Sequence, residues 1–281
     1  MFQSLQALAV ADAYGENELK ILPDFYRDRM PWTDDTAMAK AICRCLDEDG
    51  FIDQDKLARY FAESYDQDPH RGYGRGTANL LQAIQIDGQW KERSANWWGP
   101  GIGSHGNGGA MRVGPLGVYF DPRVYSFEHI ARQARLSAEV THNHPEAIAG
   151  AVAVAIAASM VTYNVLGPTG KLDWDAILLH IDGTEVGKRV RVMSTANLFR
   201  YEDVAYAFGN GSQVTAIDTV PFCLWAANEA LIENDFALTM ENVLKVGGDT
   251  DTNCAIVAGI IGNRIHPPDE WVHRTEPLSA K

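Results

Sequence analysis

The sequence predicts an all-α fold, a single compact multi-helix domain built around one core. Apolar residues recur at the three- and four-residue spacing of amphipathic helices along much of the chain. Alternation of apolar and polar residues, which predicts a half-buried strand, is confined to a weak run at residues 189–193. The chain has 281 residues, of which 46% are hydrophobic, so one unit of this size buries a sizeable core without disulfide bonds.

The expected helices follow one another along the whole chain. Residues 5–13 are apolar and small, and residues 36–46 follow a polar start, consist largely of helix formers and end at the sequence DEDG. Residues 55–65 and 77–86 share one helical apolar spacing. Further helices are predicted at residues 127–140, 147–161, 220–233, 236–246 and 252–262. Loops rich in Gly, Pro or Trp are predicted at residues 66–76, 87–109, 162–174 and 208–213.

Composition and hydropathy limit the partners. The run at residues 147–161 is the most apolar, but it is shorter than the ~20 residues that span a bilayer, so it predicts a core helix and no membrane contact. Lys and Arg total 24 against 37 Asp and Glu, a net charge of -13. A nucleic-acid binder needs a basic face, so no nucleic acid is expected as a partner. A phosphorylated small molecule remains compatible with this net charge, because helix N-termini or bound cations can make the local electrostatic potential positive.

The four cysteines indicate a reducing compartment. The N-terminus lacks the basic start of a signal peptide, so we expect a cytoplasmic protein with reduced thiols, a monomer or a weak oligomer. Cys43 and Cys45 are two residues apart, which places them on different faces of a helix. We therefore interpret both as packing residues and not as a metal-binding pair.

Two acidic loops precede predicted helices. The first is TDDT at residues 33–36, and the second is GGDTDT at residues 247–252. Thr and Asp are preferred N-caps, which accounts for one carboxylate per helix but not for two in each loop. Clustered carboxylate and hydroxyl oxygens are the ligands that Mg²⁺ and Mn²⁺ prefer. If the loops meet, four carboxylates converge, and two metal ions that share carboxylates would neutralise them.

Two glycine-rich segments and a histidine pair complete the candidate chemistry. The segments at residues 71–76 and 103–112 allow close backbone approach to a ligand and offer N–H groups to phosphate oxygens, although Gly-Asn-Gly is also an ordinary turn. His142 and His144 suggest zinc, but no further ligands stand at zinc spacing. We expect at least one of the two to be an ordinary hydrogen-bonding residue near a helix start.

Taken together, the motifs resemble a known family. TDDT, RGYGRGT, SHGNGGAMR, THNHPEAIAGA and GGDTDTNCAIVAGIIG occur in the order found in the ADP-ribosylglycohydrolase family. The resemblance runs from about residue 5 to residue 262, so we expect one domain over residues 1–281. It implies an all-α fold with a binuclear Mg²⁺ or Mn²⁺ site, and hydrolysis of the bond between the distal ribose of ADP-ribose and an acceptor.

The resemblance also assigns individual residues. It implies metal ligation by Thr33, Asp34, Asp35, Asp249, Asp251 and Thr252. It implies contacts with the ADP-ribose moiety by Gly74, Gly76, Ser104, His105, Gly106, Asn107, Gly108 and His142. The first two glycines would face the phosphates, the loop at residues 104–108 would hold the ribose and diphosphate, and His142 would contact the distal ribose or diphosphate. Position 105 is often aromatic in relatives, so weaker adenine stacking is expected at this His.

The candidate proton carriers are Asp34, Asp249 and Glu18. Relatives usually carry a glutamate seven residues after the Asp of the motif that reads DAYG here, at residues 12–15. Leu19 occupies that position in this chain, and Glu18 precedes it. A shortening by one residue would make Glu18 the equivalent, whereas its loss would impair turnover.

Several functions stay open at the level of sequence. Arginine-linked ADP-ribose on protein is the first acceptor to consider, and serine-linked or O-acetyl-ADP-ribose comes second. A non-catalytic, metal-dependent ADP-ribose-binding protein is the alternative from another class. The acidic cluster alone also permits a phosphoesterase that cuts the diphosphate, which would release AMP instead of intact ADP-ribose.

Overall fold

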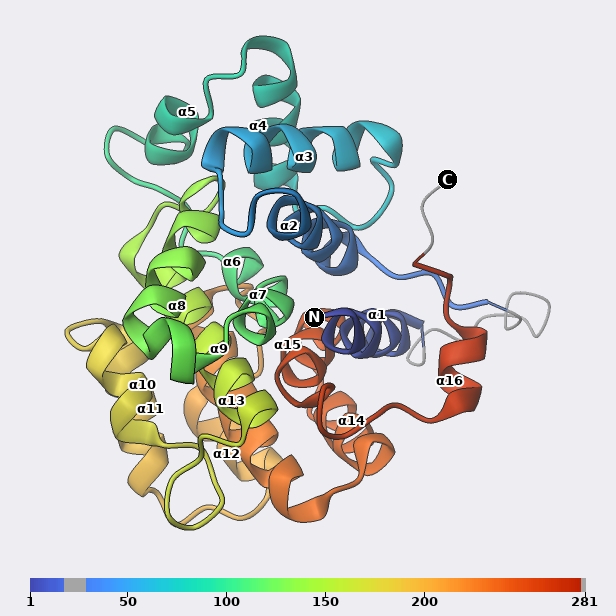
Figure 1. The fold of residues 1–281 in the computed structure, drawn as a ribbon, viewed down its shortest axis with the longest axis vertical. Helices are drawn as coiled ribbons and strands as arrows, with labels where there is room; N and C mark the ends of the chain where they lie inside the picture. The colour runs from blue at the N-terminus through green and yellow to red at the C-terminus, as the bar shows by residue number, and fades with distance from the viewer. Residues whose placement is uncertain (18–28, 279–281) are drawn as a thin grey trace.

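The structure, a computed structural model, describes residues 1–17 and 29–278 (Figure 1). These residues form helices and connecting segments without any β-strand, and their only bridges are two isolated ones, Met30 with Thr275 and Gly106 with Thr215. The all-α prediction is therefore confirmed.

The helices have the following bounds: α1 (Phe2–Asn17), α2 (Asp34–Asp49), α3 (Gln54–Gln67), α4 (Arg75–Asp87), α5 (Trp90–Asn96), α6 (Gly108–Met111), α7 (Gly114–Tyr119), α8 (Pro122–Glu139), α9 (Pro145–Tyr163), α10 (Trp174–Ile181), α11 (Glu185–Thr195), α12 (Tyr201–Phe208), α13 (Ala216–Glu233), α14 (Phe236–Lys245), α15 (Thr250–Ile261) and α16 (Asp269–Arg274).

Helix α9 is the centre of the fold (Figure 1). It contacts α7, α8, α13 and α15, and its residues from Ala147 to Val161 are all buried. By length and composition α9 is apolar enough to cross a membrane, but 83% of its most apolar window is buried inside the protein. Its alanines permit close packing: a methyl group on Gly117 of α7 would lie 2.1 Å from the carbonyl oxygen of Ala155. The composition is that of a tightly packed core helix, as predicted.

Helices α1 and α15 lie against each other over their whole length. Ser4 Oγ donates a hydrogen bond of 2.7 Å to the Gly259 carbonyl at one end. At the other end a methyl group on Gly15 would lie 2.4 Å from the Thr250 carbonyl oxygen, so only glycine permits this approach. The contact places the N-terminus of α15 beside the C-terminal half of α1.

The weak alternation at residues 189–193 does not form a strand. The segment lies inside α11, where Val186, Val190 and Met193 are buried at helical spacing. The helix agrees with the all-α prediction, and the weak alternation arises because a short run shows either period equally well. Helices α5, α6, α7, α10, α11, α12 and α16 were not predicted, since each is short or starts inside a segment rich in glycine or proline.

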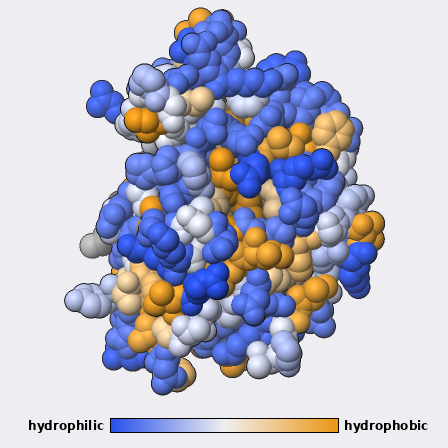
Figure 2. All heavy atoms as spheres, turned by 90° about the vertical axis from the view of Figure 1, so that its left-hand side faces the viewer, coloured by the Kyte–Doolittle hydropathy of each residue, from blue (hydrophilic) through white to orange (hydrophobic). Residues whose placement is uncertain are grey.

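The remaining predictions concern boundaries and thiols. Helix α8 starts at Pro122, five residues before the predicted start, but Ser126 has a φ of 62° and breaks the regular helix there. All four cysteines are free and buried, which agrees with the packing role predicted for Cys43 and Cys45. Hydrophilic side chains cover much of the face drawn in Figure 2, with smaller apolar areas between them.

Candidate active site

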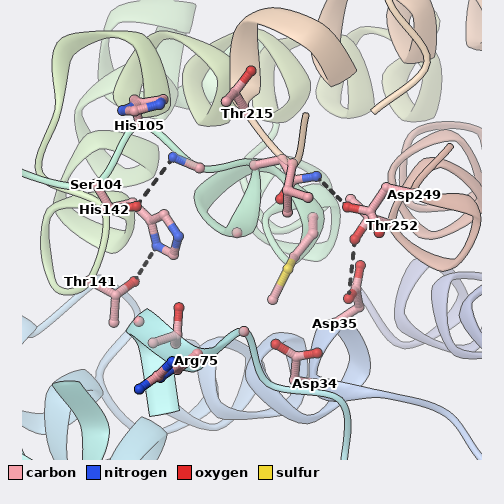
Figure 3. A pocket seen from close by; sticks show the side chains of 18 of the residues that line it. Asp34, Asp35, Arg75, Ser104, His105, Thr141, His142, Thr215, Asp249 and Thr252 are labelled. Carbon is pink, nitrogen blue, oxygen red and sulfur yellow. Dashed lines mark hydrogen bonds between the residues drawn. The ribbon is translucent and has the colours of Figure 1, made fainter. Parts of the chain in front are cut away.

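A cavity of about 420 Å³ opens where the two acidic loops meet the two glycine segments. The N-termini of α2 and α15 form one end of it, which we call the acidic end. The loop at residues 104–108 and His142 form the other, the glycine end. Figure 3 shows these ends on opposite sides of the pocket, with Arg75 of α4 along a third wall.

Helix capping holds the first acidic loop in place. Thr33 is the N-cap of α2, and its hydroxyl accepts a hydrogen bond of 3.3 Å from the backbone N–H of Asp35. The backbone N–H of Asp34 donates to the Arg71 carbonyl at 2.7 Å. The capping interpretation is therefore right for Thr33, and it leaves both aspartate side chains at the acidic end.

Asp12 of α1 holds this loop in place through hydrogen bonds. Its buried carboxylate accepts hydrogen bonds from the backbone N–H groups of Thr33 and Thr36, at 3.0 and 3.1 Å, and from the Thr36 hydroxyl. Burial is the largest influence on Asp12 and raises its pKa to about 6. The sequence analysis did not assign Asp12 to the site. The available signal was a charged residue inside the apolar run at residues 5–13, where an unpaired carboxylate is costly.

The two acidic loops meet through Asp35. Its Oδ2 accepts hydrogen bonds from the hydroxyls of Thr33, at 3.2 Å, and of Thr252, at 3.4 Å. Its Oδ1 is buried and has no hydrogen-bond partner in the described residues. Asp251 Oδ1 accepts from the N–H of Thr252 at 2.9 Å, and the Thr250 hydroxyl points away to donate to the Gly15 carbonyl.

Crowding raises the pKa of these carboxyl groups. Burial and the charge of Asp12 raise the pKa of Asp34 to about 8. Burial and the charge of Asp249 raise that of Asp251 to about 8. Burial, then the charge of Asp251, raises the pKa of Asp35 well above its usual range. Burial and the neighbouring carboxylates therefore disfavour the ionised forms of these groups, which a bound cation would favour.

The donor set of the acidic end fits a hard cation. Carboxylate and hydroxyl oxygens converge there, and the unpaired Oδ1 of Asp35 lacks a positive partner. No three Asp, Glu, His or Cys side chains among residues 1–17 and 29–278 are placed as a ready-made ligand set.

Backbone contacts fix the glycine end. Ser104 Oγ accepts from the N–H of Gly106 at 3.2 Å, and the N–H of Asn107 donates to the Val214 carbonyl at 3.2 Å. The side chain of Asn107 then reaches across the pocket, where its Nδ2 donates to Asp249 Oδ2 at 2.7 Å. One hydrogen bond thus joins the two ends.

His142 lies under this loop because glycines leave room for it. A methyl group on Gly108 would lie 2.7 Å from His142 Nε2, and one on Gly106 would lie 3.2 Å from the same atom. Burial and the charge of Arg112 lower the pKa of His142 to about 3, so the imidazole is neutral. The sequence analysis explained these glycines by ligand approach or by an ordinary turn, and it did not single out Arg112.

The histidine pair divides into two roles. His144 is the N-cap of α9, and its Nδ1 accepts from the N–H of Glu146 at 3.2 Å. It also lies edge-on to His105, with ring centroids 5.6 Å apart. The prediction that at least one of the pair is an ordinary capping residue is confirmed for His144, whereas His142 lines the pocket.

Helix α4 supplies the third wall. Its N-cap Gly74 has no side-chain cap, so N–H groups of the first turn remain available at the pocket. The Trp98 ring lies against Gly76, where a methyl group would approach it to 2.8 Å.

The pocket gathers the predicted residues Asp34, Asp35, Gly74, Gly76, Ser104, His105, Gly106, Asn107, Gly108, His142, Asp249, Asp251 and Thr252. Thr33 stands behind Asp35 as the helix cap. Glu18 lies outside the described residues. Lining residues that the sequence analysis did not name as binding residues include Arg75, Thr141, Gln213 and Thr215. Only the fold brings the segment of Gln213 and Thr215 to the pocket, whereas Arg75 and Thr141 stand directly beside predicted binding residues.

A comparison with protein families identifies the chain. The family model described as ADP-ribosylglycohydrolase matches residues 2–278. The chain belongs to the ADP-ribosylglycohydrolase family. The protein is therefore a hydrolase, and membership supports removal of ADP-ribose from modified acceptors.

Relatives of this ADP-ribosylglycohydrolase extend along most of its length. Human ADP-ribosylhydrolase ARH3 is 30% identical over 280 residues, which cover 87% of this chain and 74% of the relative. The mouse ARH3 protein is 29% identical, with 87% and 73% covered. A protein of Archaeoglobus fulgidus is 28% identical, with 94% and 82% covered. A solved structure named ADP-ribosylglycohydrolase-related protein complex covers 97% of this chain and is itself covered to 90%, with a TM-score of 0.65 and 21% identity, which indicates a shared fold.

Proposed function

We propose that the protein hydrolyses the glycosidic bond at the distal ribose of ADP-ribose, in a reaction that depends on divalent cations, with arginine-linked ADP-ribose on protein as the first acceptor. The observation that carries the proposal is the pocket itself. It joins an excess of buried carboxylates to a glycine loop through the hydrogen bond from Asn107 to Asp249. ADP-ribose suits this division, because its diphosphate is followed directly by the hydroxyl groups of the distal ribose.

Two Mg²⁺ or Mn²⁺ ions are the proposed cofactors. The residues that would hold them are Thr33, Asp34, Asp35, Asp249, Asp251 and Thr252. Bound cations of this type supply Lewis-acid activation and orient ribose hydroxyls. The unpaired Oδ1 of Asp35 and the raised pKa of Asp251 support this assignment, because both indicate a missing positive charge.

The other residues bind and orient the substrate. The loop at residues 104–108 and His142 would contact the ribose and diphosphate, while Gly74 and Gly76 at the start of α4 would offer N–H groups to phosphate oxygens. Asp34 and Asp249 are the described candidates to hold or deliver the proton for the departing acceptor, and Glu18 is the third candidate. Cleavage of such a bond passes through an oxocarbenium-like state, which nearby carboxylates stabilise.

The acceptor is the finer part of the proposal. The guanidinium of an arginine acceptor is cationic, so the acidic end is complementary to it in charge. Serine-linked and O-acetyl-ADP-ribose have uncharged linkages and are the alternatives that the experiment must separate.

The experiment incubates the protein with arginine-, serine- and acetyl-linked ADP-ribose and resolves the products by mass. Parallel reactions contain Mg²⁺, Mn²⁺ or EDTA. We expect the release of intact ADP-ribose from the arginine substrate. EDTA and the substitution Asp251→Ala should each abolish this release. The matched control Asp203→Asn changes an exposed carboxylate on α12 and keeps activity.

Each of the other possible products leads to a different conclusion. Release only from serine or acetyl linkages corrects the acceptor. AMP as product identifies a phosphoesterase. Binding of ADP-ribose without release from any substrate identifies a binding protein.

A further inference from the structure

A buried chain of donors runs from the core to the glycine end. Arg112 is fully buried, and its guanidinium lies over the Phe61 ring at 4.2 Å. Its Nη2 donates to the Ser137 carbonyl at 3.0 Å and to Thr141 Oγ1 at 2.9 Å. Thr141 Oγ1 lies 2.7 Å from His142 Nδ1. Each of these three distances is that of an ordinary hydrogen bond.

Arg112 sets the direction of the hydrogen bonds in this series of donors. Arginine has no acceptor, so Thr141 Oγ1 accepts from Arg112. The Thr141 hydroxyl is buried, and among the described residues His142 Nδ1 is the acceptor that its proton can reach. The opposite arrangement, with a proton on Nδ1, would leave the hydroxyl proton buried without a partner.

The remaining proton of the ring then belongs to Nε2. This atom faces the backbone of Gly106 and Gly108, as the short distances to methyl groups built on those residues show. No described residue accepts a hydrogen bond from it, and His142 lines the pocket. The buried guanidinium of Arg112 opposes a second proton on the imidazole. The ring therefore stays neutral and donates through Nε2 only.

We propose that Arg112 and Thr141 are positioning residues that lock His142 in the tautomer with the proton on Nε2. Locked in this way, His142 donates a hydrogen bond to an acceptor oxygen of the ligand at the glycine end. For ADP-ribose that oxygen belongs to the diphosphate or to the distal ribose. The identity of this ligand rests on the proposed function, whereas the tautomer does not.

The tautomer is measured in the full-length protein labelled with ¹⁵N-histidine. Long-range ¹H–¹⁵N spectra separate a protonated ring nitrogen from an unprotonated one, and His142→Gln assigns the signals. We expect an unprotonated Nδ1 and a protonated Nε2 that stay unchanged between about pH 5 and 8, since the ring titrates far below its usual pKa near 6.5. A proton on Nδ1, or a doubly protonated ring in this range, would overturn the proposal.

Variants of Thr141 test its part in ligand binding. Thr141→Val removes the hydroxyl, and we expect the fixed tautomer signature to be lost and the Kd for ADP-ribose to rise at least about tenfold. Thr141→Ser keeps the hydroxyl and should bind within about twofold of wild type. Thr239→Val, at a buried threonine of α14 that is not among the pocket-lining residues, is the matched control and should leave the His142 signals and the Kd unchanged.

The outcomes separate this inference from the proposed function. Equal Kd values for folded Thr141→Val and Thr141→Ser would contradict the positioning role. The wild-type spectrum decides the tautomer even if Thr141→Val does not fold. A protein that shows the tautomer and binds ADP-ribose without releasing it from any acceptor would contradict the proposed catalysis and support the inference.

Discussion

The two ends of the pocket are joined by one hydrogen bond yet differ in charge and in the direction of their pKa shifts. At the acidic end, burial and like charges raise the pKa of Asp34 and Asp251 to about 8. At the glycine end, burial lowers the pKa of His142 to about 3 and that of Arg112 to about 9. The acidic end gathers carboxyl groups whose ionised forms are disfavoured, whereas the glycine end presents a neutral donor backed by the buried cation Arg112.

The difference teaches that burial alone does not define a binding site. Both ends contain buried groups, but those at the acidic end repel one another whereas those that lead to the glycine end are hydrogen-bonded in sequence. A cluster of the first kind is stabilised by incoming cations, whereas in the second Arg112 Nη2, Thr141 Oγ1 and His142 Nδ1 are already paired. Four predictions test this contrast, from the largest effect to the smallest.

Asp35→Asn should separate function from stability at the acidic end. With divalent cations present, we expect kcat to fall about a hundredfold or more, because second-shell metal partners alone are worth 10–100-fold and Asp35 is a proposed ligand. In EDTA at pH 8 the same variant should melt at a higher temperature than wild type, because it relieves repulsion among buried carboxylates. Steady-state kinetics measures kcat, and calorimetry measures the melting temperature. Asp203→Asn is the control for both measurements. A lower melting temperature for Asp35→Asn would contradict repulsion among the buried carboxylates.

Gly108→Ala should damage the glycine end alone. The added methyl group would lie 2.5 Å from His142 Cε1, so the imidazole must move. We expect the Kd for ADP-ribose, measured by calorimetry, to rise at least about tenfold while divalent-cation binding is retained. Gly167→Ala, where the methyl group makes ordinary contacts at 3.6 Å, is the matched control. Parallel loss of cation binding in Gly108→Ala would show that the ends are not separable.

Asp12→Asn should destabilise the first acidic loop. The amide keeps one oxygen acceptor, but it places an NH₂ group where the carboxylate receives donors from Thr33 and Thr36. We expect a loss of roughly 1–3 kcal/mol in unfolding free energy, measured by urea titration. Asp53→Asn changes the N-cap of α3, where asparagine caps equally well, and should cost far less. Similar losses of unfolding free energy in both variants would show that Asp12 contributes no more than an ordinary N-cap.

The pH dependence of stability should differ between the ends. Carboxyl groups with raised pKa bind protons in the folded protein that the unfolded chain has released, so in EDTA their stabilisation falls as pH rises from about 4 to 8. His142, with its lowered pKa, has the opposite sign: stability falls as pH drops below about 6.5, where the unfolded histidine gains a proton. Melting temperatures between pH 6.5 and 8.5 therefore report the acidic end, and added Mg²⁺ should flatten that slope. A slope unaffected by Mg²⁺ would contradict cation binding by these carboxylates.

Sequence predicted the parts of the site that are written in local motifs. TDDT and GGDTDT mark helix starts by their capping residues, and both indeed begin helices whose N-termini meet in one pocket. Their meeting depends on the glycine contact between α1 and α15, which local spacing does not reveal.

The supporting residues were harder to predict because they act over long sequence separations. Asp12 reaches Thr33 across 21 residues, and Arg112 reaches Thr141 across 29. A buried charge in an apolar segment was the one available signal for Asp12. For Arg112 it was a cation directly after a glycine loop, which reads equally well as a surface residue.

Crystals soaked with Mn²⁺ and ADP-ribose, examined by anomalous scattering, test the two-ended pocket most directly. We predict manganese peaks among Asp34, Asp35, Asp249, Asp251 and Thr252, with the diphosphate against the loop at residues 104–108 and an oxygen of the ligand at hydrogen-bond distance from His142 Nε2. ADP-ribose bound without manganese at the acidic end, or with its diphosphate on the carboxylates, would contradict the account.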